Sequence, residues 1–340
     1  MYKLKKIISV LILMGLICCA VACEKQDLVI SEEIYALDTI VNLTVYNENN
    51  QAVNKAKEEI KRLEALLSVT NPESDISRIN LYPDTFVKVN EDTFELIKSS
   101  IAVSECTNGT FDVTVYPAVK LWGFTTSDYN VPSDAELLEI IPKIDYTKIE
   151  LDESTRSVRI KKGTSLDLGG IAKGYIADKT AEVLINEGVT SALLNFGGNI
   201  RLIGSKPDGS DFKLGIKAPF AEGYFAVLNA QNITASTAGG YERYFEENGK
   251  RYHHILNPKT ASPAETDFLS ATVVGKNGEI CDALSTAAFI NGSEGIDKLS
   301  ATYPDYGFIA LTDTSVYVSE RLAKDVELTE EYKNLEIKII

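Results

Sequence analysis

The chain has 340 residues, 34 of them basic and 49 acidic, which gives a formal net charge of −15 at neutral pH. This acidity argues against nucleic-acid binding, because nucleic-acid phosphates need a basic protein surface. It does not exclude a small phosphorylated ligand, since a bound divalent cation can supply positive charge locally.

The N-terminus has the pattern of a secretory signal over residues 1–22. Three lysines precede an apolar run from Ile7 to Ile17, and this run is shorter than the roughly 20 residues that span a bilayer. The pattern therefore favours a cleaved signal over an uncleaved membrane anchor. Ala20-Val21-Ala22-Cys23 resembles a bacterial lipobox. We expect Cys23 to be acylated, residues 23–33 to form a polar tether, and the protein to be lipid-anchored at the cell membrane, facing the extracytoplasmic side. Loss of three lysines with the signal would take the net charge to about −18.

The pattern of apolar residues predicts one α+β domain over residues 34–340. Strands are expected at 40–46, 193–195, 212–217, 223–229, 269–275, 307–311 and 315–318. Helices are expected at 51–67, 90–105 and 278–290, with another just after a Gly-rich run near residue 170. The alternation is too irregular for a doubly wound sheet, so we expect a single, two-lobed unit of mixed and antiparallel sheets flanked by helices.

Some intervening segments favour other structures. Residues 68–80 are polar and indicate turns, and Asn108-Gly109 indicates a helix C-cap. We interpret Cys106 and Cys281 as small buried hydrophobic residues, with a single disulfide as the alternative.

The Gly-rich run Asp167-Leu-Gly-Gly-Ile-Ala-Lys-Gly-Tyr175 is the first candidate for chemistry. Glycines let the backbone approach a ligand closely, and a following helix would direct its N-terminus toward an anion. The run lacks the spacing of a P-loop or a dinucleotide fold. A phosphate-binding turn and an ordinary strand-to-helix turn with a solvated lysine both remain open.

A second candidate is the pair Asp282 and Thr286, which share one face of a predicted helix among apolar neighbours. A carboxylate, a hydroxyl and a backbone carbonyl are oxygen ligands suited to Mg²⁺, which also binds substrate phosphates. The alternative is a helix N-terminal Asp with a Thr that bonds back to a carbonyl.

A third candidate is His253-His254, the only two histidines in the sequence. Histidine is the side chain best suited to proton transfer near neutral pH. Adjacent residues of a strand point to opposite faces, so we expect at most one of the two to reach a shared site. A structural or surface pair is the alternative.

Taken together, the motifs resemble the ApbE family of FAD:protein FMN transferases in their order and spacing. They include two segments, 109–124 and 237–245, that on their own could be hairpins with core aromatic residues. The matching segments are Ser74-Asp-Ile-Ser-Arg-Ile-Asn80, 109–124, Asp167–Tyr175, Asn195-Phe-Gly-Gly-Asn199, 237–245, 254–260 and 282–286.

The resemblance implies transfer of FMN from FAD to a Thr or Ser hydroxyl through a phosphoester bond, with Mg²⁺ as cofactor. It implies acceptors in membrane redox complexes of the Nqr and Rnf kind, or extracytoplasmic FMN-binding proteins. By match to the family motifs, Asp282, Thr286 and the Gly170 carbonyl would bind Mg²⁺, with Ser285 where some members add a carboxylate. His254 would be the base for the acceptor hydroxyl. The implied FAD contacts are Asp167 near the adenine, Lys173, Thr110, Phe111, Asp112, Ile255, Leu37 and Thr70.

The sequence departs from the family pattern at three places. Ala238 and Gly240 replace a usual Ser and Asp, Ala261 replaces a Gly, and Leu37-Asp38 replaces Met-Gly. Asp38 is an unexpected charge near the flavin pocket. Two other functions remain open: an FAD pyrophosphatase that gives FMN and AMP, and a flavin- or solute-binding lipoprotein without turnover.

Overall fold

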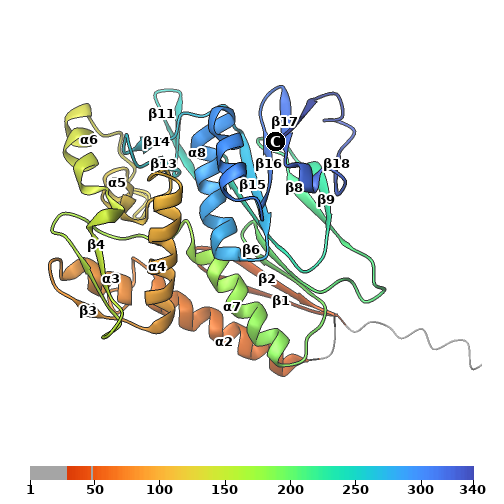
Figure 1. The fold of residues 1–340 in the computed structure, drawn as a ribbon, viewed down its shortest axis with the longest axis horizontal. Helices are drawn as coiled ribbons and strands as arrows, with labels where there is room; N and C mark the ends of the chain where they lie inside the picture. The colour runs from red at the N-terminus through yellow and green to blue at the C-terminus, as the bar shows by residue number, and fades with distance from the viewer. Residues whose placement is uncertain (1–28, 47–48) are drawn as a thin grey trace, which may run out of the picture.

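A computed structural model describes residues 29–46 and 49–340 (Figure 1). The expected signal and the lipidation site Cys23 lie outside these residues. No helix in the described ranges is both long and apolar enough to cross a membrane.

A mixed sheet forms the centre of the described structure. Nine strands of the described residues build it: β1 (Ile30–Ala36), β2 (Thr39–Val45), β6 (Ala192–Phe196), β7 (Asn199–Ile203), β10 (Thr234–Gly239), β15 (Ser270–Gly275), β16 (Gly307–Leu311), β17 (Ser315–Val318) and β19 (Glu336–Ile339). They follow one another across the sheet in this order. Neighbours are antiparallel except β17 and β19, which run parallel.

Three helices pack on one face of this sheet: α2 (Asn50–Leu67), α7 (Ala172–Asn186) and α8 (Gly278–Thr302). The other helices of the described residues are α3 (Asp75–Leu81), which contacts α2, α4 (Glu91–Cys106), which contacts α8, α5 (Tyr116–Leu121) and α6 (Asp134–Ile140). α2 forms because its buried residues, among them Ala56, Ile60 and Leu63, recur at helical spacing and point at the sheet. α2 packs on α7, and α7 packs on α8 (Figure 1). The main core lies between these helices and the sheet.

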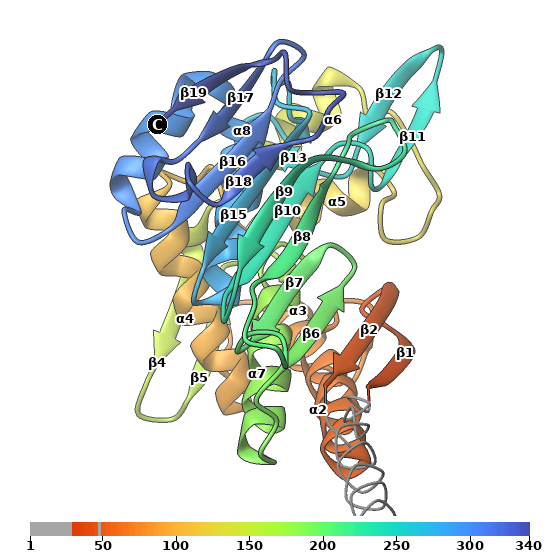
Figure 2. The same cartoon turned by 90° about the vertical axis from the view of Figure 1, so that its right-hand side faces the viewer.

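The opposite face of the sheet packs on a smaller sheet formed by β8 (Phe212–Lys217), β9 (Tyr224–Ala230) and β18 (Val326–Leu328). Phe212 and Phe225 fill the core between the two sheets. The remaining strands are β3 (Val87–Lys88), β4 (Ile149–Asp152), β5 (Ser157–Ile160), β11 (Tyr244–Glu247), β12 (Lys250–His253), β13 (Leu256–Asn257) and β14 (Ser262–Pro263). The β11–β12 hairpin projects from one end of the molecule, at the upper right of Figure 2.

The structure confirms the α+β class and the predicted helices and strands, but several local expectations are wrong. Part of the expected turn region 68–80 is the helix α3, and β1 begins inside the expected tether, at Ile30. Residues 109–124 form a 3-10 turn and α5 rather than a hairpin. α8 runs past residue 290 to Thr302, with a kink at Gly292. Cys106 is exposed and Cys281 is buried, and both are free thiols.

Candidate functional site

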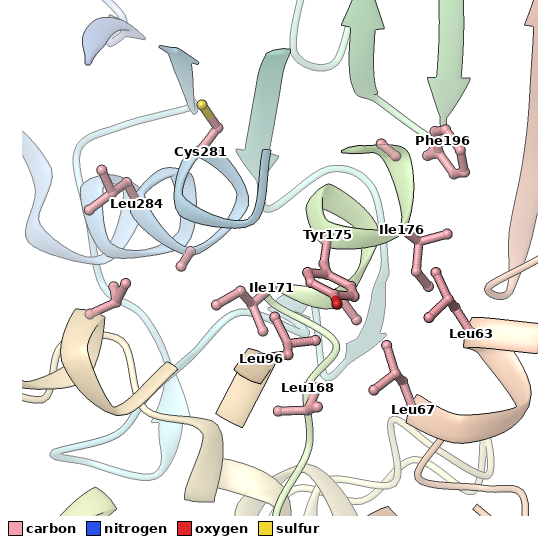
Figure 3. Packing of buried hydrophobic residues seen from close by; sticks show 14 of the residues in the cluster. Leu63, Leu67, Leu96, Leu168, Ile171, Tyr175, Ile176, Phe196, Cys281 and Leu284 are labelled. Carbon is pink, nitrogen blue, oxygen red and sulfur yellow. The ribbon is translucent and has the colours of Figure 1, made fainter. Parts of the chain in front are cut away.

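The Gly-rich run forms the turn that leads into α7. The Asp167 N–H donates to the Val113 carbonyl at 2.8 Å, and the Asp167 carboxylate accepts the Gly169 N–H at 2.8 Å. Leu168 and Ile171 are buried, and Figure 3 shows them in the same cluster as Leu96 and Tyr175. The apolar residues of the run thus anchor it in the core, while Gly169 and Gly170 stay accessible to a ligand.

Close packing of α7 on α8 brings the run to the second candidate segment. A Cβ on Gly174 would lie 2.0 Å from the Gly278 carbonyl oxygen, so the two helices meet at a distance that only glycine permits. The Gly174 N–H donates to Oδ2 of Asp282 at 3.0 Å, and this carboxylate is only 5% exposed. Gly174 therefore holds both the helix spacing and the orientation of Asp282.

We expect Gly174→Ala to lower the free energy of unfolding by about 3 kcal/mol, because the added methyl group would overpack this contact. Urea denaturation followed by circular dichroism would measure the loss. The control is Lys298→Ala in α8, where the side chain is exposed. This control should change the free energy of unfolding by no more than about 0.5 kcal/mol. Equal stability of the two variants would contradict the helix-contact argument.

The three expected metal ligands lie together. A Cβ on Gly170 would be 3.7 Å from Oγ1 of Thr286, one helical turn from Asp282. Within the described residues, no hydrogen bond reaches Oδ1 of Asp282 or the Thr286 hydroxyl. A buried carboxylate oxygen and a hydroxyl beside a glycine backbone fit a hard cation such as Mg²⁺.

Ser285 differs from these residues. Its hydroxyl is buried and donates to the Asp282 carbonyl at 2.8 Å within α8. Over the described ranges, no group of three or more His, Cys, Asp and Glu side chains could hold a metal. The expected metal ligands, Asp282, Thr286 and the Gly170 carbonyl (here called the metal set), therefore include one carboxylate, that of Asp282.

His254 follows β12 and has a defined tautomer. Its Nδ1–H donates to the Arg243 carbonyl at 3.1 Å, which leaves Nε2 with a free lone pair. The ring is partly accessible, yet the protein packed around it lowers the pKa of His254 to about 3, and the charges of Lys173 and Arg243 act in the same direction. The imidazole is therefore neutral and can accept a proton at Nε2.

This low pKa predicts the pH dependence of a reaction in which His254 is the base. Protonation inactivates a base, and in the free protein it occurs only near pH 3. We therefore expect kcat/KM for FAD to fall less than twofold between pH 7.5 and 5.5, measured as AMP release at saturating Mg²⁺. An acid limb with its midpoint near 6.5, the ordinary value for histidine, would contradict this.

His253 has a structural role instead. Its ring Nε2 lies 3.2 Å from the Ala264 carbonyl, and the ring packs edge-on against Phe289. Burial lowers the pKa of His253 as well. That at most one histidine of the pair reaches a shared site stays a prediction.

Charged side chains surround Asp167. Burial raises the pKa of Asp167, and the negative charge of Asp38 adds to this effect, whereas Lys173 and Arg243 oppose it. Arg243 also donates to the Phe124 carbonyl at 2.5 Å. Sequence reasoning did not list Arg243 among the site residues, although it lies in the matching segment 237–245. The available signal was its place in that segment, after Tyr241 and Glu242.

The remaining expected FAD contacts near Gly170 and His254 are of two kinds, buried apolar side chains and polar side chains that bond to the protein itself. Phe111 is buried and lies against Gly170, where an added Cβ would be 3.3 Å from the Phe111 ring, and Ile255 is buried directly after His254. Thr110 is buried and donates to the Asn291 side chain at 3.3 Å. The carboxylate of Asp112 accepts three hydrogen bonds, from the backbone and hydroxyl of Thr114 and from the backbone of Tyr146. Asp112 therefore holds the loop that carries Phe111.

Leu37 and Thr70 lie on loops. Leu37 and Asp38 form the turn between β1 and β2, and both have positive φ, at 58° and 55°. Two-residue hairpins with this geometry normally use Asn-Gly, so a leucine here is unusual. Thr70 is exposed in the loop before α3, and its hydroxyl lies 3.0 Å from that of Ser68.

Comparison with known proteins decides the family. The ApbE family profile matches residues 37–309. The chain belongs to the ApbE family. FAD:protein FMN transferase from Klebsiella pneumoniae is 34% identical over 258 residues, which cover 74% of this chain and 79% of the relative. The transferase from Haemophilus influenzae is 30% identical over 307 residues, 86% of this chain and 89% of the relative.

Solved structures agree with this assignment. The ApbE protein of Thermotoga maritima superposes with a TM-score of 0.80 at 31% identity, over 91% of this chain and 99% of that one. The flavinyl transferase ApbE of Pseudomonas stutzeri, at 24% identity, shares the fold with a TM-score of 0.77, over 92% and 98% of the two chains.

Two departures from the ApbE pattern have local explanations. A Cβ on Gly240 would lie 2.8 Å from the His253 ring, so the usual Asp would not fit without moving that ring. Ala261 has φ of 54°, a conformation that suits the usual Gly better, and its carbonyl accepts the Trp122 indole N–H at 2.8 Å. Nothing in the structure explains Ala238, which is buried in β10.

Proposed function

We propose that this ApbE protein is a Mg²⁺-dependent FAD:protein FMN transferase that modifies a Thr or Ser hydroxyl of a partner protein. The observation that carries the proposal is that the Asp282 carboxylate and the Thr286 hydroxyl lie one helical turn apart, beside the Gly170 backbone. In addition, the charges of Lys173 and Arg243 act on both Asp167 of the Gly-rich turn and His254.

Asp282, Thr286 and the Gly170 carbonyl would hold the cation. Bound Mg²⁺ would neutralise charge on the FAD pyrophosphate, which an acidic protein needs in order to hold an anionic substrate. Lys173 and Arg243 lie near Asp167 and are available to the same anion. Asp167 would address the adenine end of FAD, and Phe111 and Ile255 would give apolar contact to the cofactor.

His254 would accept the proton of the acceptor hydroxyl at Nε2. The hydroxyl oxygen would then bond to the phosphorus of the FMN half, and the bond from this phosphorus to the bridging oxygen would break, so that AMP leaves. The Nδ1–H bond to Arg243 keeps Nε2 unprotonated and aimed for this step. A negative substrate beside the ring would raise the low pKa of His254 toward the working range.

The same interpretation places the protein on the extracytoplasmic side of the membrane, anchored through Cys23. Its acceptors would be membrane redox complexes of the Nqr and Rnf kind or extracytoplasmic FMN-binding domains. Labelling with a fatty-acid analogue in cells would test the anchor, with Cys23→Ala expected to abolish incorporation.

The proposed activity is tested by incubating the protein with FAD, Mg²⁺ and a purified extracytoplasmic FMN-binding domain. Intact-mass spectrometry should show the domain gaining the mass of FMN, and chromatography should show an equal amount of AMP. AMP and free FMN without labelled acceptor would indicate a pyrophosphatase instead. Bound FAD without any AMP would indicate a binding protein.

A further inference from the structure

The segment Ser74–Asn80 matches the family pattern, yet none of its residues belongs to the metal set or touches His254. It forms α3, with Ser74 as N-cap accepting the Ser77 N–H at 2.9 Å. The side-chain contacts of this short helix, described next, indicate that it positions neighbouring segments.

α3 is fixed to α4 by Asp75. This carboxylate is 4% exposed and accepts hydrogen bonds from the Asn90 N–H and the Thr93 hydroxyl, both at 2.8 Å. Arg78 pairs with the other oxygen of Asp75 and also donates to the Lys88 carbonyl. The Ser77 hydroxyl donates to the Val69 carbonyl at 3.1 Å, which ties down the loop that carries Thr70.

Asn80, near the end of α3, holds the strand-like segment that leads into the site. Its Nδ2–H donates to the Leu166 carbonyl at 2.9 Å, and its Oδ1 accepts the Leu166 N–H at 2.7 Å. The amide thus pairs with Leu166 as a neighbouring strand would. Residues 164–168 belong to no strand, and Leu166 is fully buried, so Asn80 satisfies both of its backbone groups.

We propose that Asn80 is a positioning residue that fixes Asp167 and Gly170 for FAD and Mg²⁺ binding. Asp167 follows Leu166 directly, and Gly170 lies four residues beyond Leu166 along the same segment. The contacts that run from α4 through Asp75, α3 and Asn80 to Leu166 therefore act together with the Asp167–Val113 bond and the buried Leu168 to set where both groups stand. We call the two hydrogen bonds between Asn80 and Leu166 the clamp. The effect on FAD and Mg²⁺ binding rests on the proposed function, whereas the clamp does not.

The test uses Asn80→Ala beside a matched control, Asn49→Ala. Asn49 also makes one donated and one accepted backbone bond, to the Glu187 carbonyl at 2.8 Å and from the Ala52 N–H at 2.9 Å, between the start of α2 and the end of α7. Both variants should lose thermal stability. Only Asn80→Ala should raise the Kd for FAD, followed by flavin fluorescence, and the half-saturating Mg²⁺ concentration, each at least tenfold.

Asn80→Asp gives a second test that does not depend on removing the side chain. At neutral pH the aspartate can still accept the Leu166 N–H, but it cannot donate to the Leu166 carbonyl, which would face it as a second acceptor. FAD affinity of Asn80→Asp should therefore stay within threefold of that of Asn80→Ala, and wild-type affinity in Asn80→Asp would contradict the proposal. The nearly equal size of the Asp side chain also keeps the test informative where Asn80→Ala folds poorly.

Hydrogen exchange separates the clamp from the function. Peptides covering residues 164–170 should exchange faster in Asn80→Ala than in wild type or Asn49→Ala, with no FAD or metal added. Unchanged exchange there, or FAD and Mg²⁺ affinities within twofold of wild type in Asn80→Ala, would overturn the proposal. Wild-type protein that binds no FAD would overturn the proposed function, while the exchange result would still decide the clamp.

Discussion

Asp282→Ala is expected to lower FMN transfer by about a hundredfold to a thousandfold at millimolar Mg²⁺, because Asp282 is the one carboxylate among the proposed metal ligands. Initial rates of AMP release, measured over a Mg²⁺ titration, would show both a lower maximum and a higher half-saturating concentration. The same carboxylate accepts the Gly174 N–H, so part of the effect of alanine could be structural.

Asp282→Asn separates these two contributions. The asparagine oxygen can still accept the Gly174 N–H while the negative charge is lost, so stability should stay within about 1 kcal/mol of wild type. Transfer should nevertheless fall nearly as far as in Asp282→Ala. Ser285→Ala should keep most of the activity, because the Ser285 hydroxyl donates to the Asp282 carbonyl within the helix. Full transfer by Asp282→Asn at low Mg²⁺ would refute the metal assignment.

His254→Ala is expected to slow transfer to a protein acceptor by about a hundredfold to ten-thousandfold, the usual contribution of a general base. FAD affinity should change little, because the proposed role of Nε2 is toward the acceptor hydroxyl. Single-turnover transfer, followed by intact mass at saturating FAD and acceptor, isolates this step. Added imidazole should restore part of the rate by occupying the space of the missing ring.

The control for this experiment is the neighbouring residue. His253→Ala removes a ring that packs on Phe289, so it should lower stability but leave the transfer rate per folded molecule within about threefold. Transfer at the wild-type rate by His254→Ala, or an equal loss of rate in both variants, would show that His254 is not the base.

Elements with strong periodicity were predictable from the sequence. α2 follows from apolar residues that recur every three to four positions, and β2 and β8 follow from apolar residues at every second position. β16 follows from a short continuous apolar run, all of it buried. α3 was missed because it is seven residues long and polar, and its stability comes from tertiary contacts of Asp75 with α4. β1 was missed because alternating exposed residues made it look like part of a tether.

Those parts of the candidate site that depend on the residue pattern within one segment were predictable from the sequence. The spacing of Asp282 and Thr286 indicated a shared helix face, and the glycines indicated close approach. The meeting of these segments was not predictable from periodicity, because it depends on Gly174 lying against Gly278, 104 residues apart in the sequence. Asp112 illustrates the opposite case, since a buried carboxylate beside the site proves to organise a loop through three hydrogen bonds.

The presence of only one carboxylate among the proposed metal ligands would have a thermodynamic consequence. In the absence of FAD, one carboxylate, one hydroxyl and one carbonyl would bind Mg²⁺ weakly. In the absence of Mg²⁺, the anionic FAD would bind weakly because the protein is acidic. Each ligand would therefore strengthen the binding of the other by the same factor, as linkage requires. Departure of AMP would take one of the two phosphates out of the site, so Asp282, Thr286 and the Gly170 carbonyl would hold Mg²⁺ less tightly after turnover than with FAD bound.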